Sequence, residues 1–102
     1  GLNVSNVVTM SNTLAGLWLN VIDLTGWDTH NVEDMSHMFD YSNYLNTVYA
    51  SNSFVTTKVT KFEGIFDRCT VTGALGNRPS SDSIEYARID EPGKPGAFTR
   101  RP

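Results

Sequence analysis

Cys69, His30 and His37 carry the side chains of this sequence best suited to nucleophilic chemistry. A thiol beside an imidazole base can act as an activated nucleophile. However, Cys69 comes at the end of a recurring apolar segment, where a half-buried structural thiol is ordinary. The local sequence around these residues matches no nucleophile motif. We therefore expect no catalytic residue and no enzymatic activity.

His30, Asp34 and His37 have a spacing that suggests a metal site. On one continuous helix, steps of four and three residues would bring them together, and imidazole and carboxylate groups are zinc ligands. The apolar residues of the same segment, beginning with Val32 and Met35, follow a different stripe, which places the three polar side chains in solvent. We therefore expect no bound metal and no other cofactor.

Composition and charge narrow the class of partner. The 102 residues carry a formal net charge of −3, and 29 of them are Asn, Ser or Thr, a neutral polarity typical of extracellular scaffolds. An acidic chain is poorly suited to neutralising phosphates, so we expect no nucleic-acid partner. The single cysteine excludes an internal disulfide, and no apolar stretch approaches the roughly 20 residues of a membrane helix. Because the sequence opens on Gly1, we expect it to be a piece of a longer protein.

The sequence repeats itself with a period of about 26 residues, which falls in the 20–29-residue window of leucine-rich-repeat coils. The repeated segments are 6–15, 31–40 and 58–67, and their apolar positions coincide. The aligned columns are Val7, Val32 and Val59; Met10, Met35 and Phe62; Thr13, Met38 and Ile65; Leu14, Phe39 and Phe66. We therefore predict three imperfect repeats over residues 1–75 and a cap and tail over 76–102.

Each repeat predicts a short strand, a turn and a short helix. Residues 19–24 alternate in polarity and are rich in β-branched side chains, which predicts a strand, and 45–50 is a weaker copy. Apolar residues at three- and four-residue steps predict short helices over 32–39 and 59–67. Trp27 lies in the turn between strand and helix.

Stacking of these repeats predicts a short right-handed α/β solenoid, leucine-rich-repeat-like, with a parallel sheet and short helices. A strand over 83–90, followed by a turn over 91–96 that precedes residues 97–99, would form a C-terminal β cap on the last coil. The residues predicted to be buried in the core are Met35, Met38, Phe39, Ile65 and Phe66.

Residues 24–39 read LTGWDTHNVEDMSHMF and resemble the repeat of the BspA-type leucine-rich-repeat surface proteins of bacteria. That repeat runs approximately Asp-Leu-Ser-x-Trp-Asp-Thr-Ser-x-Val-x-x-Met-x-x-Met-Phe. Segments 86–90 and 95–99 also resemble the ending that closes such arrays. The first and third repeats depart from the pattern at Leu14 and Phe62, which are apolar exchanges that a core tolerates.

The resemblance implies a cell-surface or secreted protein, often wall-anchored in Gram-positive bacteria, with a role in adhesion and no catalytic motif. It also implies that Trp27 is buried between coils rather than free to stack on a glycan. Two functions stay open. The first is an adhesion module that binds a host surface protein or glycan. The second is a structural spacer or cap that supports a neighbouring domain. A binding module needs a few exposed anchors on one face, whereas a spacer predicts none.

The predicted interaction surface is the outer face of the sheet, bordered by an acidic rim. Its residues are Asn20 and Asp23 in one coil, Asn46 and Tyr49 in the next, and Asp28, Glu33, Asp34 and Asp40 on the rim. Such a surface would bind a polar or basic partner weakly through hydrogen bonds.

Overall fold

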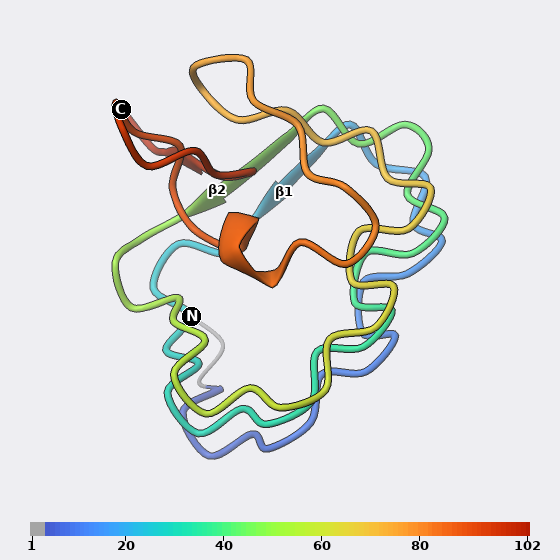
Figure 1. The fold of residues 1–102 in the computed structure, drawn as a ribbon, viewed down its shortest axis with the longest axis vertical. Helices are drawn as coiled ribbons and strands as arrows, with labels where there is room; N and C mark the ends of the chain where they lie inside the picture. The colour runs from blue at the N-terminus through green and yellow to red at the C-terminus, as the bar shows by residue number, and fades with distance from the viewer. Residues whose placement is uncertain (1–3) are drawn as a thin grey trace.

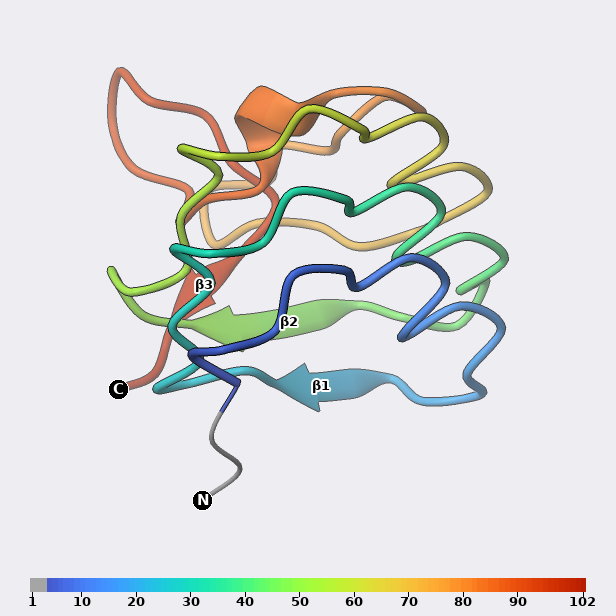
Figure 2. The same ribbon diagram turned by 90° about the horizontal axis from the view of Figure 1, so that it is seen from below.

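A computed structural model describes residues 4–102 of the chain. The chain winds through three turns that lie one above another, and the C-terminal segment covers the last of them (Figures 1 and 2). Three strands, β1 (Val21–Asp23), β2 (Thr47–Ala50) and β3 (Thr99–Arg100), form one parallel sheet in the order β1-β2-β3. A single turn of 3₁₀ helix, η1 (Ile84–Tyr86), is the one helix among the described residues, and it is too short to cross a membrane.

The two repeat strands form where the alternating pattern predicts them. They pair with Val21 opposite Thr47 and Asp23 opposite Tyr49, so residues one repeat period apart lie next to each other in the sheet. β3 pairs with the other side of β2, where Thr99 lies opposite Tyr49. The last strand is therefore a parallel neighbour of the repeat strands, at the end of the segment expected to form the cap.

The short helices predicted over 32–39 and 59–67 are wrong, because these segments consist of turns. Left-handed backbone recurs at two positions of each repeat, four residues apart. The first position is held by Asn12, His37 and Gly64, with φ of 61°, 55° and 64°, and the second by Gly16, Tyr41 and Arg68, with φ of 67°, 62° and 52°. A right-handed helix cannot continue through such residues.

Backbone groups of these turns bond to the neighbouring turn instead of within a helix. Alternate N–H groups of 35–41 donate to carbonyls of 61–67, as in the 2.7 Å bond from Met35 to Lys61, and a similar ladder joins the first and second turns. Tight local turns, such as the bond from the Met38 N–H to the Met35 carbonyl, bring apolar side chains back inward every three or four residues. This spacing equals that of one face of a helix. The apolar pattern therefore predicts correctly which side chains point into the core, but it wrongly predicts a helical backbone.

The strand predicted over 83–90 is also wrong. Its first half forms η1, and the N–H of Ala87 donates to the Ile84 carbonyl at 3.0 Å. The buried hydroxyl of Ser83 accepts a hydrogen bond from the Ser80 N–H, which closes a turn immediately before η1. Only an isolated bridge from Ile89 to Phe98 remains of the predicted strand.

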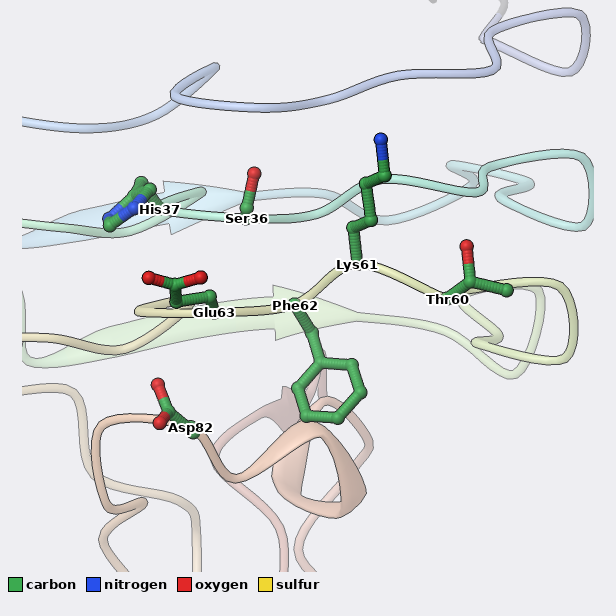
Figure 3. Close-up of a pocket in the computed structure, with 7 residues that line it drawn as sticks. All are labelled: Ser36, His37, Thr60, Lys61, Phe62, Glu63 and Asp82. Atoms are coloured by element: carbon green, nitrogen blue, oxygen red, sulfur yellow. The ribbon is translucent and has the colours of Figure 1, made fainter.

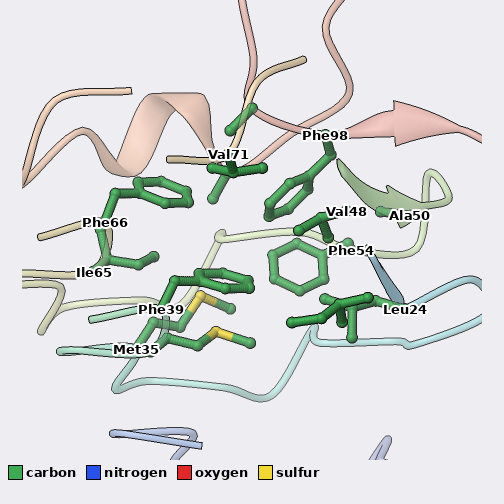
Figure 4. Close-up of a cluster of buried hydrophobic side chains, with 14 of the residues drawn as sticks. Leu24, Met35, Phe39, Val48, Ala50, Phe54, Ile65, Phe66, Val71 and Phe98 are labelled. Atoms are coloured by element: carbon green, nitrogen blue, oxygen red, sulfur yellow. The ribbon is translucent and has the colours of Figure 1, made fainter. Parts of the chain in front are cut away.

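The core lies between the sheet and the stacked turns (Figure 4). The five residues predicted to be buried are all in it, which confirms that prediction. The rings of Phe39 and Phe66 stack with centres 5.4 Å apart. Phe98, from the C-terminal segment, packs edge-on against Phe54 at 5.0 Å, so this segment contributes an aromatic ring to the same core as the repeated segments.

Candidate interaction surfaces

Asp23 and Tyr49, two of the predicted surface residues, lie side by side on the outer face of the sheet. Pairing of β1 with β2 sets them opposite each other. Arg101, which follows β3, reaches across both of them. Its Nη1 lies 2.7 Å from Oδ2 of Asp23, and its guanidinium carbon lies 5.3 Å from the centre of the Tyr49 ring. This part of the predicted surface is therefore in contact with the chain's own C-terminal segment.

The charge of Asp23 is stabilised locally. Hydrogen bonds from Thr25 lower the pKa of Asp23, and the nearby guanidinium of Arg101 lowers this pKa further. The carboxylate is therefore ionised at neutral pH. Because both members of the Asp23–Arg101 ion pair are exposed, water and salt screen it and its contribution to stability is small.

Asn20 and Asn46 are exposed and lie next to each other just before β1 and β2. The N–H of Asn46 donates to the Asn20 carbonyl at 2.8 Å. Alternation along β1 directs Ile22 into the core and leaves Val21 and Asp23 exposed. Val21, rather than Asn20, is thus the neighbour of Asp23 in the outer row of the sheet.

Two carboxylates of the predicted acidic rim, those of Asp28 and Asp34, have separate hydrogen-bond partners. Asp28 accepts hydrogen bonds from His30, whose Nδ1 lies 2.8 Å from the Asp28 carboxylate, and these bonds lower the pKa of Asp28. Asp34 accepts bonds from the hydroxyl and N–H of Ser36, which lower the pKa of Asp34. Glu33 is exposed. Asp34 forms isolated β-bridges with Thr9 of the preceding turn and with Lys61 of the following turn, and it is not part of the sheet.

His30, Asp34 and His37 do not converge on a common point. His30 and Asp34 have the separate partners described above, and Nδ1 of His37 lies 3.3 Å from the carboxylate of Asp40. Asp40 is buried, so its predicted place on the acidic rim is wrong. Among residues 4–102, no group of three His, Cys, Asp or Glu side chains is placed to hold a metal ion.

Cys69 is partly buried, at the end of the third repeated segment. Burial raises the pKa of its thiol to about 11. The side chain is therefore protonated at neutral pH, and a protonated thiol is a poor nucleophile. These properties match those of a structural thiol.

An aromatic groove lies at the corner where the stacked turns lead into β1 and β2. Trp18 is 80% exposed and Tyr44 is 55% exposed, and their rings stack with centres 5.3 Å apart and 29° between planes. The groove has a volume of about 270 Å³. Its lining residues are Gly16, Leu17, Trp18, Tyr41, Asn43 and Tyr44. None of these residues is charged, so the groove presents aromatic faces, an amide and backbone groups.

The sequence reasoning missed this groove although one signal was present. Trp18 and Tyr44 are separated by one period of the repeat, and both precede a strand. Trp27, expected to be buried between coils, is partly buried and packs against the core. Tyr41 could not be placed from sequence, because its position beside Trp18 depends on how the turns stack.

Tyr41 is held in place by Arg68 of the next turn. The guanidinium carbon of Arg68 lies 3.9 Å from the centre of the Tyr41 ring, and its Nη1 donates a hydrogen bond to the Tyr41 hydroxyl. The backbone of Tyr41 is bonded to the same turn, since its N–H donates to the Asp67 carbonyl at 3.0 Å. One side of the groove is therefore preformed by contacts within the chain.

A second groove, of about 430 Å³, lies on the stacked turns next to η1 (Figure 3). It is lined by Ser36, His37, Thr60, Lys61, Phe62, Glu63 and Asp82. One carboxylate is already engaged, because Asp82 accepts a hydrogen bond from the Gly64 N–H at 2.6 Å. In Figure 3 the Lys61 side chain points away from Glu63 and Asp82. The positive and negative groups that border the groove therefore do not point toward one common position.

The model of one protein family, described as "Mycoplasma protein of unknown function, DUF285", matches residues 1–77. The match includes all three repeated segments, whereas η1 and β3 lie outside it. Comparison with curated proteins found no match, and neither did comparison with solved structures.

Proposed function

The chain belongs to the DUF285 family, and from this premise we propose that it is a non-enzymatic interaction module of a bacterial surface protein, acting in adhesion outside the cell. The match covers three quarters of the sequence but describes a family of unknown function. The function is therefore argued from the surface of this chain and from its resemblance to BspA-type repeats.

In this proposal the repeats form a short right-handed leucine-rich-repeat-like solenoid. Support comes from the parallel pairing of β1 with β2, one repeat period further along the chain, and from the ladder that joins successive turns. A solenoid displays equivalent positions of successive coils as one continuous surface. A residue pair such as Trp18 and Tyr44 then forms a binding surface that neither coil has alone.

The aromatic groove carries the proposal. Exposing a large aromatic side chain to water is unfavourable, and clustered exposed rings mark binding sites because aromatic residues dominate interface energetics. A binding module needs exposed anchors, and Trp18, which is 80% exposed, is a side chain of this kind. The spacer alternative draws its support from the other face, where Arg101 already contacts Asp23 and Tyr49.

The proposed binding is weak and depends on many copies. A groove of this size offers few contacts, so we expect a single-module Kd on the order of 0.1–1 mM. Multivalent display on a cell surface raises the overall affinity by a factor of about 10²–10⁴ without any new contact.

Adhesion of beads that carry many copies of the chain tests the proposal. Coated beads are expected to attach to mucin or to host-matrix proteins, and the Trp18→Ala/Tyr44→Ala variant to lose about tenfold or more of this attachment. The control variant Leu75→Ala removes an exposed apolar side chain outside the groove and should attach like the unmodified chain. If coated beads attach no better than bare beads to any of these surfaces, the spacer or cap function replaces the binding function.

A further inference from the structure

We propose that the aromatic groove binds one pyranose ring of a neutral glycan. This inference rests on the proposed function and names the ligand class of the same site. It combines three observations, which are the stacked and exposed rings, the uncharged lining and the small volume of the groove.

The rings supply a platform for the apolar face of a sugar. One face of a pyranose carries C–H groups with weak positive charge, and the face of an aromatic ring carries negative charge, so the two attract and exclude water. Trp18 meets Tyr44 at one side of its ring and is nevertheless 80% exposed. Most of the indole is therefore available for stacking, and Tyr44 supports it from the neighbouring turn.

Polar groups of the groove suit hydroxyls rather than charges. The Asn43 side-chain amide makes no hydrogen bond to the other described residues, and an amide can both donate to and accept from a hydroxyl. Arg68, which packs on the groove residue Tyr41, also contacts Asp67, whose Oδ2 lies 3.4 Å from Nη2 of Arg68. An acidic sugar would therefore find no free cation among the lining residues.

The volume limits the size of the ligand. At about 270 Å³ the groove lies just below the range of about 300–1,000 Å³ typical of small-molecule pockets. It accommodates one sugar ring with its rim of hydroxyls, but not a peptide helix. A glycan chain would thus be held by one residue while the rest of it extends into solvent.

Titration of the whole chain with neutral monosaccharides tests the inference directly. The probes are the methyl glycosides of galactose, glucose, mannose and N-acetylglucosamine, followed by ¹H–¹⁵N NMR. At least one of them is expected to shift the Trp18 indole N–H and the Asn43 and Tyr44 amides while the Trp27 indole stays unchanged. No shift at Trp18 up to about 50 mM sugar, far above the expected Kd range, would overturn the inference.

Two variants and a control separate ring stacking from general effects on folding. Trp18→Phe keeps an aromatic face and should retain binding within a few-fold, whereas Trp18→Ala should weaken it about tenfold or more. Leu75→Ala removes an exposed apolar side chain that does not line the groove, and this variant should bind like the unmodified chain. Equal binding by Trp18→Ala would contradict the inference, provided its amide spectrum shows a folded chain.

Mucin stripped of its glycans distinguishes this inference from the broader function. Loss of bead attachment after glycan removal supports both. If beads bind stripped and intact mucin equally, and the Trp18→Ala/Tyr44→Ala variant binds neither, the groove takes a polypeptide. The glycan inference then fails while the adhesion function stands.

Discussion

Asp90 is a buried carboxylate that joins the C-terminal segment to the loop before it. Its Oδ1 accepts hydrogen bonds from the Asn77 amide at 2.8 Å and the Gly96 N–H at 3.1 Å, and its Oδ2 accepts one from the Leu75 N–H at 2.8 Å. Burial raises the pKa of Asp90, but the hydrogen bonds from Asn77, Leu75 and Gly96 together outweigh it, so the pKa lies below its ordinary value of 3.8.

We therefore predict that Asp90→Asn lowers the free energy of unfolding at pH 7 by about 3 kcal/mol, because one amide oxygen cannot serve all of these donors. Because the pKa of Asp90 is lowered in the folded state, the stability it contributes is present above pH 4 and is lost as the pH falls through the folded-state pKa. Urea unfolding at pH 7 and pH 3 measures the free energy of unfolding of the unmodified chain and of the variant. The difference between these two free energies should be smaller at pH 3 than at pH 7.

Glu91→Gln is the matched control, since Glu91 is an exposed neighbouring carboxylate that is 3.7 Å from Arg100. It should change stability by less than about 0.5 kcal/mol at both pH values. If Asp90→Asn lowers the free energy of unfolding by the same amount at pH 3 and pH 7, the shape of the Asp90 side chain, and not its charge, stabilises the fold.

At the scale of elements, the left-handed positions determine whether the repeated segments form turns or helices. Gly64 has a φ of 64°, and a Cβ added there would lie 2.6 Å from Nδ1 of His37. Gly93 has a φ of 76°, and an added Cβ would meet nothing within 4 Å. The two glycines share a backbone conformation and differ in their surroundings.

Gly93→Ala should therefore cost about 1–2 kcal/mol, the strain of a left-handed alanine, and Gly64→Ala should cost more because the His37 ring must also move. Thermal melts of both variants measure the difference between them. Equal losses would mean that the His37 side chain moves aside freely and that the stacking of the turns does not depend on it.

At the scale of the whole molecule, one hydrophobic core includes residues of the repeated segments and of the C-terminal segment. Met38 is fully buried in it, between the turns and the sheet. Met38→Ala should lower the free energy of unfolding by about 2–5 kcal/mol, because it removes apolar contacts and leaves a cavity. Chemical denaturation followed by circular dichroism checks this value.

Val8→Ala is the comparison for that experiment, because Val8 is half exposed on an outer surface of the first turn. Its cost should stay below about 0.5 kcal/mol. If Met38→Ala and Val8→Ala lower the free energy of unfolding equally, the inward-pointing apolar side chains of the repeated segments do not form the core.

Sequence alone determined the features that depend on composition and period. The repeat period predicts the register of Asp23 with Tyr49, and the repeated apolar columns predict the buried positions of residues such as Met38 and Phe66. These predictions succeed because burial of apolar side chains follows directly from hydrophobicity, and a repeat places equivalent residues in equivalent surroundings.

Only the tertiary structure decided the backbone of the turns and the composition of the surfaces. A three- and four-residue apolar spacing fits a helix and a series of tight turns equally well, and the left-handed conformations of His37 and Tyr41 become clear only once their N–H groups bond to the next turn. Likewise, Arg101 meets Asp23 from the far end of the chain, and Tyr41 meets Trp18 only when the turns stack. Such contacts depend on where distant segments cross, which no local pattern of residues encodes.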